Sequence, residues 1–200
     1  MPPAACDMLA SGRAPPPRYR RVTRRQALPP SGDLPLSRRA FDAVGAWLVA
    51  HPAPLWLVNN PVKRWVTQRS AGDYDHAATR AELVSLIAAD GVVVFSATYC
   101  PFSYRVKYEL RQASIPFTVH ETNILPNGRA LVAELGELTG RTSIPSIFIA
   151  GVPIGGCNDG TPGLRPLIAQ GGLEAALAAC SPEWQARRRQ ALADAAARAA

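Results

Sequence analysis

The feature that most constrains the fold is an apolar run that ends just before a cysteine and a proline. Residues 92–96 read Val-Val-Val-Phe-Ser, a short continuous apolar run typical of a buried strand. Residues 101–114 have the apolar spacing of an amphipathic helix, which places Cys100 at its N-terminus. Backbone N–H donors and the helix dipole stabilise a thiolate there. Since a thiolate attacks disulfides, Cys100 is the candidate reactive residue.

The other cysteines do not form a pair with this thiol along the chain. Ser103 stands three residues after Cys100, where a second cysteine would lie in a two-thiol motif. Cys6, Cys157 and Cys180 are widely spaced and too few in 200 residues for a disulfide scaffold. This usage favours a reducing compartment with one reactive thiol. The three histidines are scattered, so the sequence predicts no zinc site.

The periodicity of the second half predicts a mixed α/β fold. The expected elements are helix 81–89, strand 92–96, helix 101–114, strand 117–121, helix 128–138, strands 146–150 and 152–155, and helices 164–169 and 173–179. Gly140 is expected to stop the helix before it. This order of elements fits a small mixed sheet that is covered by helices on both faces.

The N-terminal residues differ in composition from the rest of the chain. The first 30 residues contain six arginines and one acidic residue, Asp7, within a net charge of +7. Residues 1–36 are rich in proline and bury little, so they are predicted to be disordered. Their Arg-rich composition favours a transit segment for a plastid or other organelle, with a cytoplasmic location otherwise. No aromatic platform accompanies the basic residues, so we expect no nucleic-acid partner.

Two further segments flank the expected domain at residues 76–180. Residues 37–75 are predicted to form a helical N-terminal extension, with helices at 37–50 and 55–69 and an interruption at Pro61. A helical pair packed on the domain is favoured over a membrane-surface helix, and no piece is long enough to span a bilayer. Residues 181–200 are predicted to form an Ala/Arg-rich helix, interpreted as a solvated extension without a site.

Two loops are expected to converge on Cys100. A cis Pro145 would turn the backbone of Ile144 toward the thiol, where it offers its N–H and C=O to an extended peptide. Two glycines precede Cys157, Asn158 and Asp159, a segment that could hold an amino-acid head group. Free N–H groups would take the carboxylate and Asp159 the ammonium. The thiol, the peptide-pairing edge and this clamp indicate a site for a small peptide thiol such as glutathione.

Residues from about 77 to 178 resemble a glutaredoxin. The matching pieces are residues 92–103, 138–140, 142–149 and 155–159. The resemblance implies a thioredoxin fold, a four-stranded mixed sheet flanked by helices, with a cis Pro145. It implies glutathione as co-substrate, held by Thr98 and Phe102 near the thiol, Ile144 and Pro145, the backbone of Cys157 and Asn158, and the Asp159 side chain. The implied reaction is reduction of protein–glutathione mixed disulfides by Cys100.

The sequence departs from the family pattern at two positions that would bind glutathione. Ala97 stands where family members usually have a lysine, which helps bind the glycine carboxylate of glutathione. Val132 stands where a glutamine commonly supports the same carboxylate. Arg129 and Arg141 are the candidate substitutes.

Ser103 groups the chain with single-cysteine active sites, for which two alternatives stay open. One is a dimer that carries a [2Fe–2S] cluster on glutathione and one Cys100 from each chain. It is less favoured, because the Cys-Gly-Phe-Ser branch known for this role has glycine in place of Pro101. The other is a regulatory module with little turnover. Without a cluster, we expect a monomer whose partners are glutathione and glutathionylated proteins. We expect Cys157 to have a structural role rather than to act as a resolving thiol.

Overall fold

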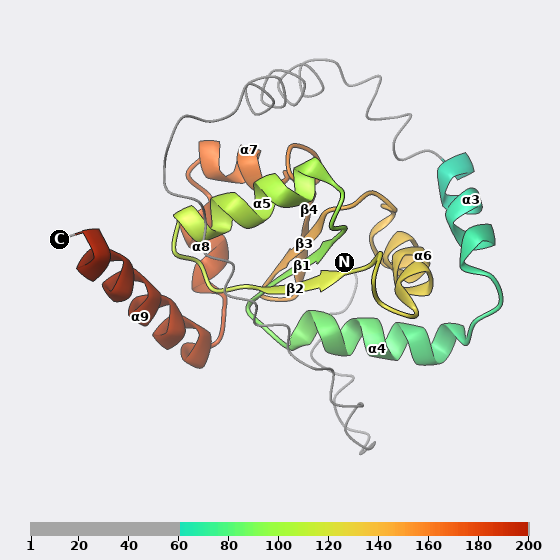
Figure 1. Cartoon of the computed structure of the whole chain (residues 1–200), viewed down its shortest axis with the longest axis horizontal. Coiled ribbons are helices and arrows are strands. Elements are labelled where there is room, and N and C mark those ends of the chain that lie inside the picture. The colour runs from blue at the N-terminus through green and yellow to red at the C-terminus, as the bar shows by residue number, and fades with distance from the viewer. Residues whose placement is uncertain (1–60, 200) are drawn as a thin grey trace. The chain divides into compact units, whose positions relative to one another are not determined.

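The structure is a computed structural model in which residues 61–199 are described, and these residues surround one four-stranded sheet (Figure 1). The strands are β1 (Val92–Ser96), β2 (Thr118–Glu121), β3 (Ser146–Ile149) and β4 (Val152–Gly155), in the order β2-β1-β3-β4. β1 pairs with β2 in parallel, and β3 pairs with both β1 and β4 in antiparallel fashion. This mixed sheet with its flanking helices confirms the predicted thioredoxin fold.

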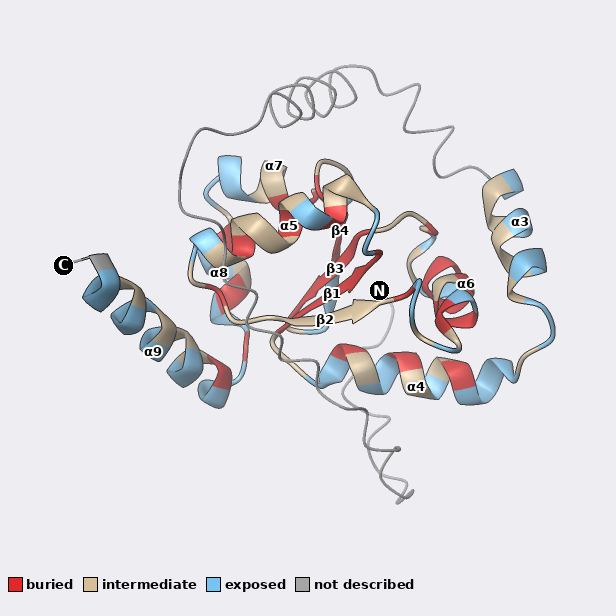
Figure 2. Cartoon of the chain, in the orientation of Figure 1, coloured by how far each residue is buried: buried red, intermediate tan, exposed pale blue. Residues whose placement is uncertain are grey.

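Alternation along β1 separates two apolar cores. The whole of β1 and β3 is buried (Figure 2). Val92 and Val94 pack with residues of α5 (Pro101–Gln112), α7 (Leu164–Ala169) and α8 (Leu173–Ala178). Val93 and Phe95 pack with residues of α4 (His76–Ala88) and α6 (Gly128–Thr139) on the other face. Because successive strand residues point to opposite faces, one buried strand serves both cores.

Local signals set the ends of two helices. α4 begins at His76, five residues before the predicted start, because the Asp75 side chain accepts a hydrogen bond from the N–H of Ala78 at 2.9 Å. α6 ends at Gly140, whose φ of 73° is the left-handed conformation that glycine adopts without steric cost. The predicted stop at Gly140 is therefore confirmed.

The segment before the sheet is attached to α6 by polar contacts. Tyr74, His76 and Arg80 all contact the carboxylate of Glu134, at 3.1, 2.9 and 3.2 Å. The Glu134 side chain is only 4% exposed. Burial opposes its ionisation, but the hydrogen bonds from His76, Arg80 and Tyr74 outweigh burial and lower the pKa of Glu134. The charged form of Glu134 therefore stabilises the fold.

The N-terminal extension is described from α3 (Pro61–Ala71) onward. Pro61 is the first described residue of this helix, so the interruption predicted there lies at the edge of the described residues. The helix predicted at residues 37–50, the start of that at 55–69 and the disorder predicted for residues 1–36 lie outside the described residues. None of the helices in the described part of the chain is long and apolar enough to cross a membrane.

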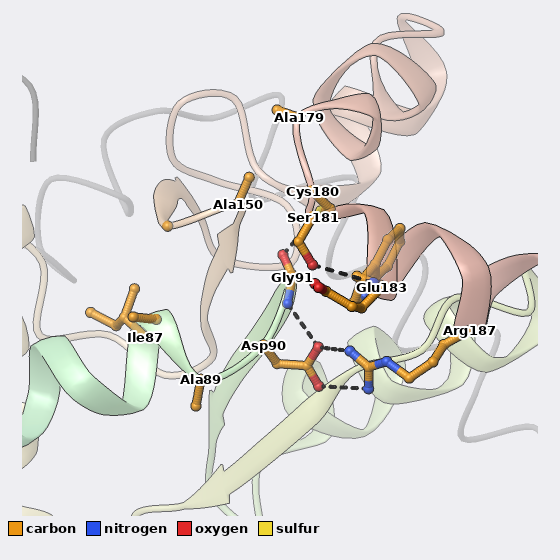
Figure 3. Close-up of a pocket in the computed structure, with 13 residues that line it drawn as sticks. Ile87, Ala89, Asp90, Gly91, Ala150, Ala179, Cys180, Ser181, Glu183 and Arg187 are labelled. Carbon is orange, nitrogen blue, oxygen red and sulfur yellow. Dashed lines mark hydrogen bonds and ion pairs between the residues drawn. The ribbon is translucent and has the colours of Figure 1, made fainter. Parts of the chain in front are cut away.

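The C-terminal helix α9 (Pro182–Ala199) joins the core at its first turn. Trp184 is fully buried in the core on the α5 face, and its indole N–H donates to the carbonyl of Pro116 at 3.2 Å. Arg187, one turn later, pairs with Asp90 beside a cavity of about 610 Å³ (Figure 3). The interpretation of this helix as a solvated extension is therefore wrong at its start, because Trp184 finds partners far away in the sequence.

Candidate functional site

Cys100 is the N-cap residue of α5 and lies opposite the loop that leads into β3. Its φ of −83° and ψ of 119° are extended, and its carbonyl accepts the first helical hydrogen bond, from Tyr104 at 3.0 Å. The half-buried thiol donates to the carbonyl oxygen of Ile144 at 3.5 Å. The Ile144–Pro145 peptide is cis, as the resemblance implied. The structure thus brings the thiol and the proline loop together.

Ser103 supports the loop before the thiol. Its side chain is 0% exposed, and its hydroxyl accepts a hydrogen bond from the N–H of Ala97 at 3.4 Å. Ala97 is itself buried, at 3% exposed. The residue that replaces a second thiol therefore has a structural contact of its own.

Asn123 holds the loop that contains Thr98. The backbone N–H of Thr98 donates to Asn123 Oδ1 at 2.9 Å, and Asn123 Nδ2 donates to the Thr98 hydroxyl at 2.7 Å. The sequence reasoning missed Asn123. The parallel pairing of β1 and β2 places Ser96 beside Glu121. Thr98 and Asn123 each lie two positions beyond these residues, so this pairing would have predicted that they lie side by side.

The aromatic residues beside the thiol differ in their surroundings. Phe102 is half-buried and packs against the core beneath α5. Tyr99 is 80% exposed. Phe102 is therefore fixed by packing, whereas Tyr99 leaves a ring at the surface next to Cys100.

The loop after β4 is closed by a backbone hydrogen bond at its base. The N–H of Gly156 donates to the carbonyl of Asp159 at 2.6 Å, which closes the turn. A Cβ atom on Gly156 would lie 2.6 Å from Asp159 Oδ1, so only glycine fits without a shift. Among the described residues, no hydrogen bond uses the backbone N–H groups of Cys157 and Asn158. These two donors are thus available for a carboxylate.

Asp159 forms an ion pair with Arg141 in this structure. The Arg141 Nη2 and Asp159 Oδ2 atoms are 2.7 Å apart, and the two side chains are 16% and 21% exposed. Arg141 Nη2 also contacts the hydroxyl of Ser143 at 3.4 Å. Arg141, a candidate for the glycine carboxylate, therefore lies instead at the predicted amino-acid clamp. Arg129, the other candidate, is exposed on α6, and Val132 is half-buried there.

The remaining described thiols are buried. Cys157 is 2% exposed, and burial, reinforced by the charge of Glu109, raises the pKa of its thiol to about 12. Cys180 is 7% exposed and donates to the carbonyl of Gly91 at 3.3 Å. Burial raises its pKa as well. The alternative of Cys157 as a resolving thiol is disfavoured, because a protonated buried thiol is a poor nucleophile.

The cavity beside α9 lies away from this site. Asp90, Ala150, Cys180 and Trp184 are among its lining residues, whereas Cys100, Ile144 and Asp159 are not (Figure 3). Within residues 61–199, no group of three or more His, Cys, Asp or Glu side chains could hold a metal ion.

A thioredoxin fold with one half-buried cysteine at a helix start, opposite a cis-proline loop, defines the class of this protein. The family model for glutaredoxin matches residues 92–154. The chain is 38% identical over 93 residues to Glutaredoxin-C2 of Arabidopsis thaliana, which covers 44% of the chain and 83% of that protein. It is 39% identical over 93 residues to a glutaredoxin of Vernicia fordii, and this match covers 44% of the chain and 88% of that protein. The chain belongs to the glutaredoxin family.

Other relatives match over different lengths. Glutaredoxin-C4, chloroplastic, of Oryza sativa subsp. japonica is 40% identical over 74 residues, which are 37% of the chain and 56% of that protein. Among solved structures, a buckwheat glutaredoxin–glutathione complex is 29% identical, with a TM-score of 0.48. The match covers 52% of this chain and 90% of the buckwheat chain. A wheat glutaredoxin is 35% identical, with a TM-score of 0.48, and the match covers 52% of this chain and 93% of the wheat chain.

Proposed function

We propose that the protein is a glutathione-dependent thiol–disulfide oxidoreductase that reduces protein–glutathione mixed disulfides with Cys100 alone. The observation that carries the proposal is the contrast among the described thiols. Cys100 is half-buried at a helix start, whereas Cys157 and Cys180 are buried and Ser103 fills the second position of the motif. One accessible thiol is sufficient for this reaction.

The reaction proceeds by two thiol–disulfide exchanges. The Cys100 thiolate attacks the glutathionyl sulfur of the mixed disulfide, that S–S bond breaks, and the protein thiolate leaves and takes a proton from water. A second glutathione, as its thiolate, then attacks the glutathionyl sulfur on Cys100. Glutathione disulfide leaves and Cys100 returns as a thiolate, so that in sum one free glutathione is oxidised while the mixed disulfide is reduced to the free protein thiol.

The proposed binding mode uses the loops around the thiol. The backbone of Ile144, next to Pro145, pairs with the cysteine residue of glutathione as an added strand would. The N–H groups of Cys157 and Asn158 take the γ-glutamyl carboxylate, and Asp159 takes its ammonium. Thr98 and Phe102 flank the sulfur. A buckwheat glutaredoxin in complex with glutathione is among the similar structures, which fits this choice of ligand.

The test is turnover of a glutathionylated model protein by wild type, Cys100→Ser and Ser103→Ala. We expect Cys100→Ser to lose activity and Ser103→Ala to keep most of it. Equal losses in both variants would contradict the one-thiol mechanism, and glutathione binding without turnover would indicate a regulatory module. Visible absorbance of an iron–sulfur cluster in protein purified without oxygen would instead favour the dimeric cluster carrier.

We also propose that the protein acts as a monomer and that residues 1–36 direct it to a plastid or other organelle. The composition of residues 1–36 and the chloroplastic relative from Oryza sativa support this location. A reporter fused to residues 1–36 should enter a plastid or another organelle. A reporter that stays in the cytosol would contradict the proposed address.

A further inference from the structure

The guanidinium of Arg141 lies between the two loops that would hold glutathione. Its Nη2 atom is 2.7 Å from Asp159 Oδ2, in the loop after β4, and 3.4 Å from the hydroxyl of Ser143, in the loop before β3. A Cβ atom on Gly156 would lie 3.2 Å from this Nη2 atom and 3.3 Å from the carbonyl oxygen of Pro145. The guanidinium therefore borders the backbone on which the proposed amino-acid clamp is built.

The end of α6 fixes the backbone of Arg141. The N–H of Arg141 donates to the hydroxyl of Thr139 at 3.2 Å, and that hydroxyl donates to the carbonyl of Leu135, one turn earlier, at 2.7 Å. The Arg141 side chain is only 16% exposed. Because the backbone is fixed and the side chain is largely buried, Arg141 loses less conformational freedom than an exposed arginine would when a ligand binds.

The guanidinium has more donors than its described partners use. A guanidinium carries N–H groups on Nε, Nη1 and Nη2. The hydrogen bonds of Arg141 to other described side chains all use Nη2, and its Nε is buried without a partner in the described part of the chain. The N–H groups of Cys157 and Asn158, in the loop that Arg141 contacts, are likewise unused by any hydrogen bond within residues 61–199. Unused donors around one carboxylate favour an anionic group of a ligand at this place.

A second arginine beside this loop has a carboxylate of its own. Arg165 Nη1 is 3.4 Å from Asn158 Oδ1, and Arg165 Nε is 3.4 Å from Glu109 Oε1. Arg165 therefore balances a carboxylate on α5, whereas Arg141 balances the carboxylate that would bind the ligand.

The charges at Arg141 and Asp159 match the head of an α-amino acid. In the γ-glutamyl residue of glutathione, an ammonium and a carboxylate of opposite charge are bonded to the same carbon atom. An ammonium on Asp159 would place this carboxylate beside the guanidinium and the two unused N–H groups. Positive and negative groups would then alternate around a closed ring, so that each group attracts both of its neighbours.

We infer that Arg141 binds the α-carboxylate of the γ-glutamyl residue of glutathione while it remains paired with Asp159. The inference rests on the proposed glutathione site and deepens it. Arg141 then sets specificity: thiols with a complete α-amino-acid head bind tightly, and thiols without the α-carboxylate bind weakly. The cation acts at the γ-glutamyl end of the ligand, whereas Ala97 supplies no cation for the glycine end.

The first test compares the affinities of variants for S-methylglutathione, which cannot exchange disulfides, by isothermal titration calorimetry. Arg141→Gln should weaken binding about tenfold, because a charge-assisted contact is lost. Arg141→Lys, which keeps the charge but not the planar fork, should weaken it about threefold. Arg189→Gln removes the same charge from an exposed position on α9 and should change affinity by less than about twofold. Tighter binding by Arg141→Gln would show that Arg141 only competes with the ammonium for Asp159, which would overturn the inference.

The second test identifies the ligand group that Arg141 contacts. The γ-aminobutyryl analogue of S-methylglutathione keeps the ammonium and lacks only the α-carboxylate. It should bind Arg141→Gln no more weakly than wild type, whereas S-methylglutathione should show the tenfold loss. An equal loss for both ligands would show that Arg141 only holds Asp159 in place. That result, or no loss for either ligand, would overturn the role of Arg141 and leave the glutathione site intact. Failure of the wild type to bind S-methylglutathione would contradict the proposed function and this inference together.

Discussion

The two ends of strand β1 each place a thiol against a backbone carbonyl, and only one of these thiols is accessible. Cys100 follows β1 in the sequence and donates to Ile144 O at 3.5 Å. Cys180 comes much later in the sequence but lies beside the start of β1, where it donates to Gly91 O at 3.3 Å. Cys180 is buried, with a raised pKa, whereas Cys100 is half-buried at a helix start. Accessibility and the helix terminus, rather than the thiol–carbonyl contact, distinguish the reactive end.

The two ends also differ in their charged groups and in their shape. Beside Cys180, the buried carboxylate of Asp90 is paired with Arg187 next to a cavity of about 610 Å³. At the other end, Arg141 and Asp159 form an ion pair at 2.7 Å between two loops. This cavity therefore belongs to the structural end, which shows that a cavity alone does not locate the thiol proposed to react.

The largest expected effect separates the two thiols by activity. Cys100→Ser should lower turnover of a glutathionylated substrate by about a thousandfold or more, because the nucleophile is removed. Cys180→Ser should keep turnover within about twofold, since its thiol lies outside the site. Steady-state assays on both variants measure this difference. A comparable loss in Cys180→Ser would remove the functional distinction between the two ends.

Alkylation of the native protein should separate the thiols by reactivity. Burial raises the pKa of Cys157 to about 12 from an ordinary 9.0, so near pH 7 it holds about a thousandfold less thiolate than an ordinary cysteine. Burial also protects Cys180. Brief treatment with iodoacetamide followed by mass mapping should find Cys100 labelled first among these three. Earlier labelling of Cys157 or Cys180 would contradict the account.

Stability should depend more on the Cys180 end. Trp184→Ala should lower the free energy of unfolding by about 3–5 kcal/mol, because a fully buried indole and its hydrogen bond are lost. Leu192→Ala, at a position 45% exposed on the same helix, is the matched control and should change it little. Urea titration measures both. A loss below about 1 kcal/mol in Trp184→Ala would show that α9 is not part of the core.

The polar attachment of the N-terminal segment should have a smaller, pH-dependent effect. Glu134→Gln should lower the free energy of unfolding by about 1–3 kcal/mol at pH 7. The folded-state pKa of Glu134 lies below its ordinary 4.5, so its contribution is present above that value and lost as pH falls through the folded pKa. Urea titrations at pH 7 and in acid should show the two proteins converging in acid. A pH-independent difference would argue against an ionised Glu134.

Local signals account for what the sequence predicted well. Strand 92–96 matches β1 at both ends, because the continuous apolar run that begins after Gly91 and ends at Ser96 defines it. The cis Pro145 was also expected, from the resemblance. The burial of Trp184 was not foreseen, since its hydrogen-bond partner Pro116 lies 68 residues earlier in the chain. The pair of Arg141 with Asp159 likewise depends on the fold that brings two loops together.

The most direct test of the one-thiol mechanism is to trap its intermediate. Wild type is mixed with a glutathionylated substrate without free glutathione, quenched in acid, and mapped by mass spectrometry. We expect one glutathione bound to Cys100 by a disulfide, and the substrate released as its free thiol. Glutathione on Cys157 or Cys180, or a disulfide between Cys100 and the substrate protein, would contradict the attack of Cys100 on the glutathionyl sulfur.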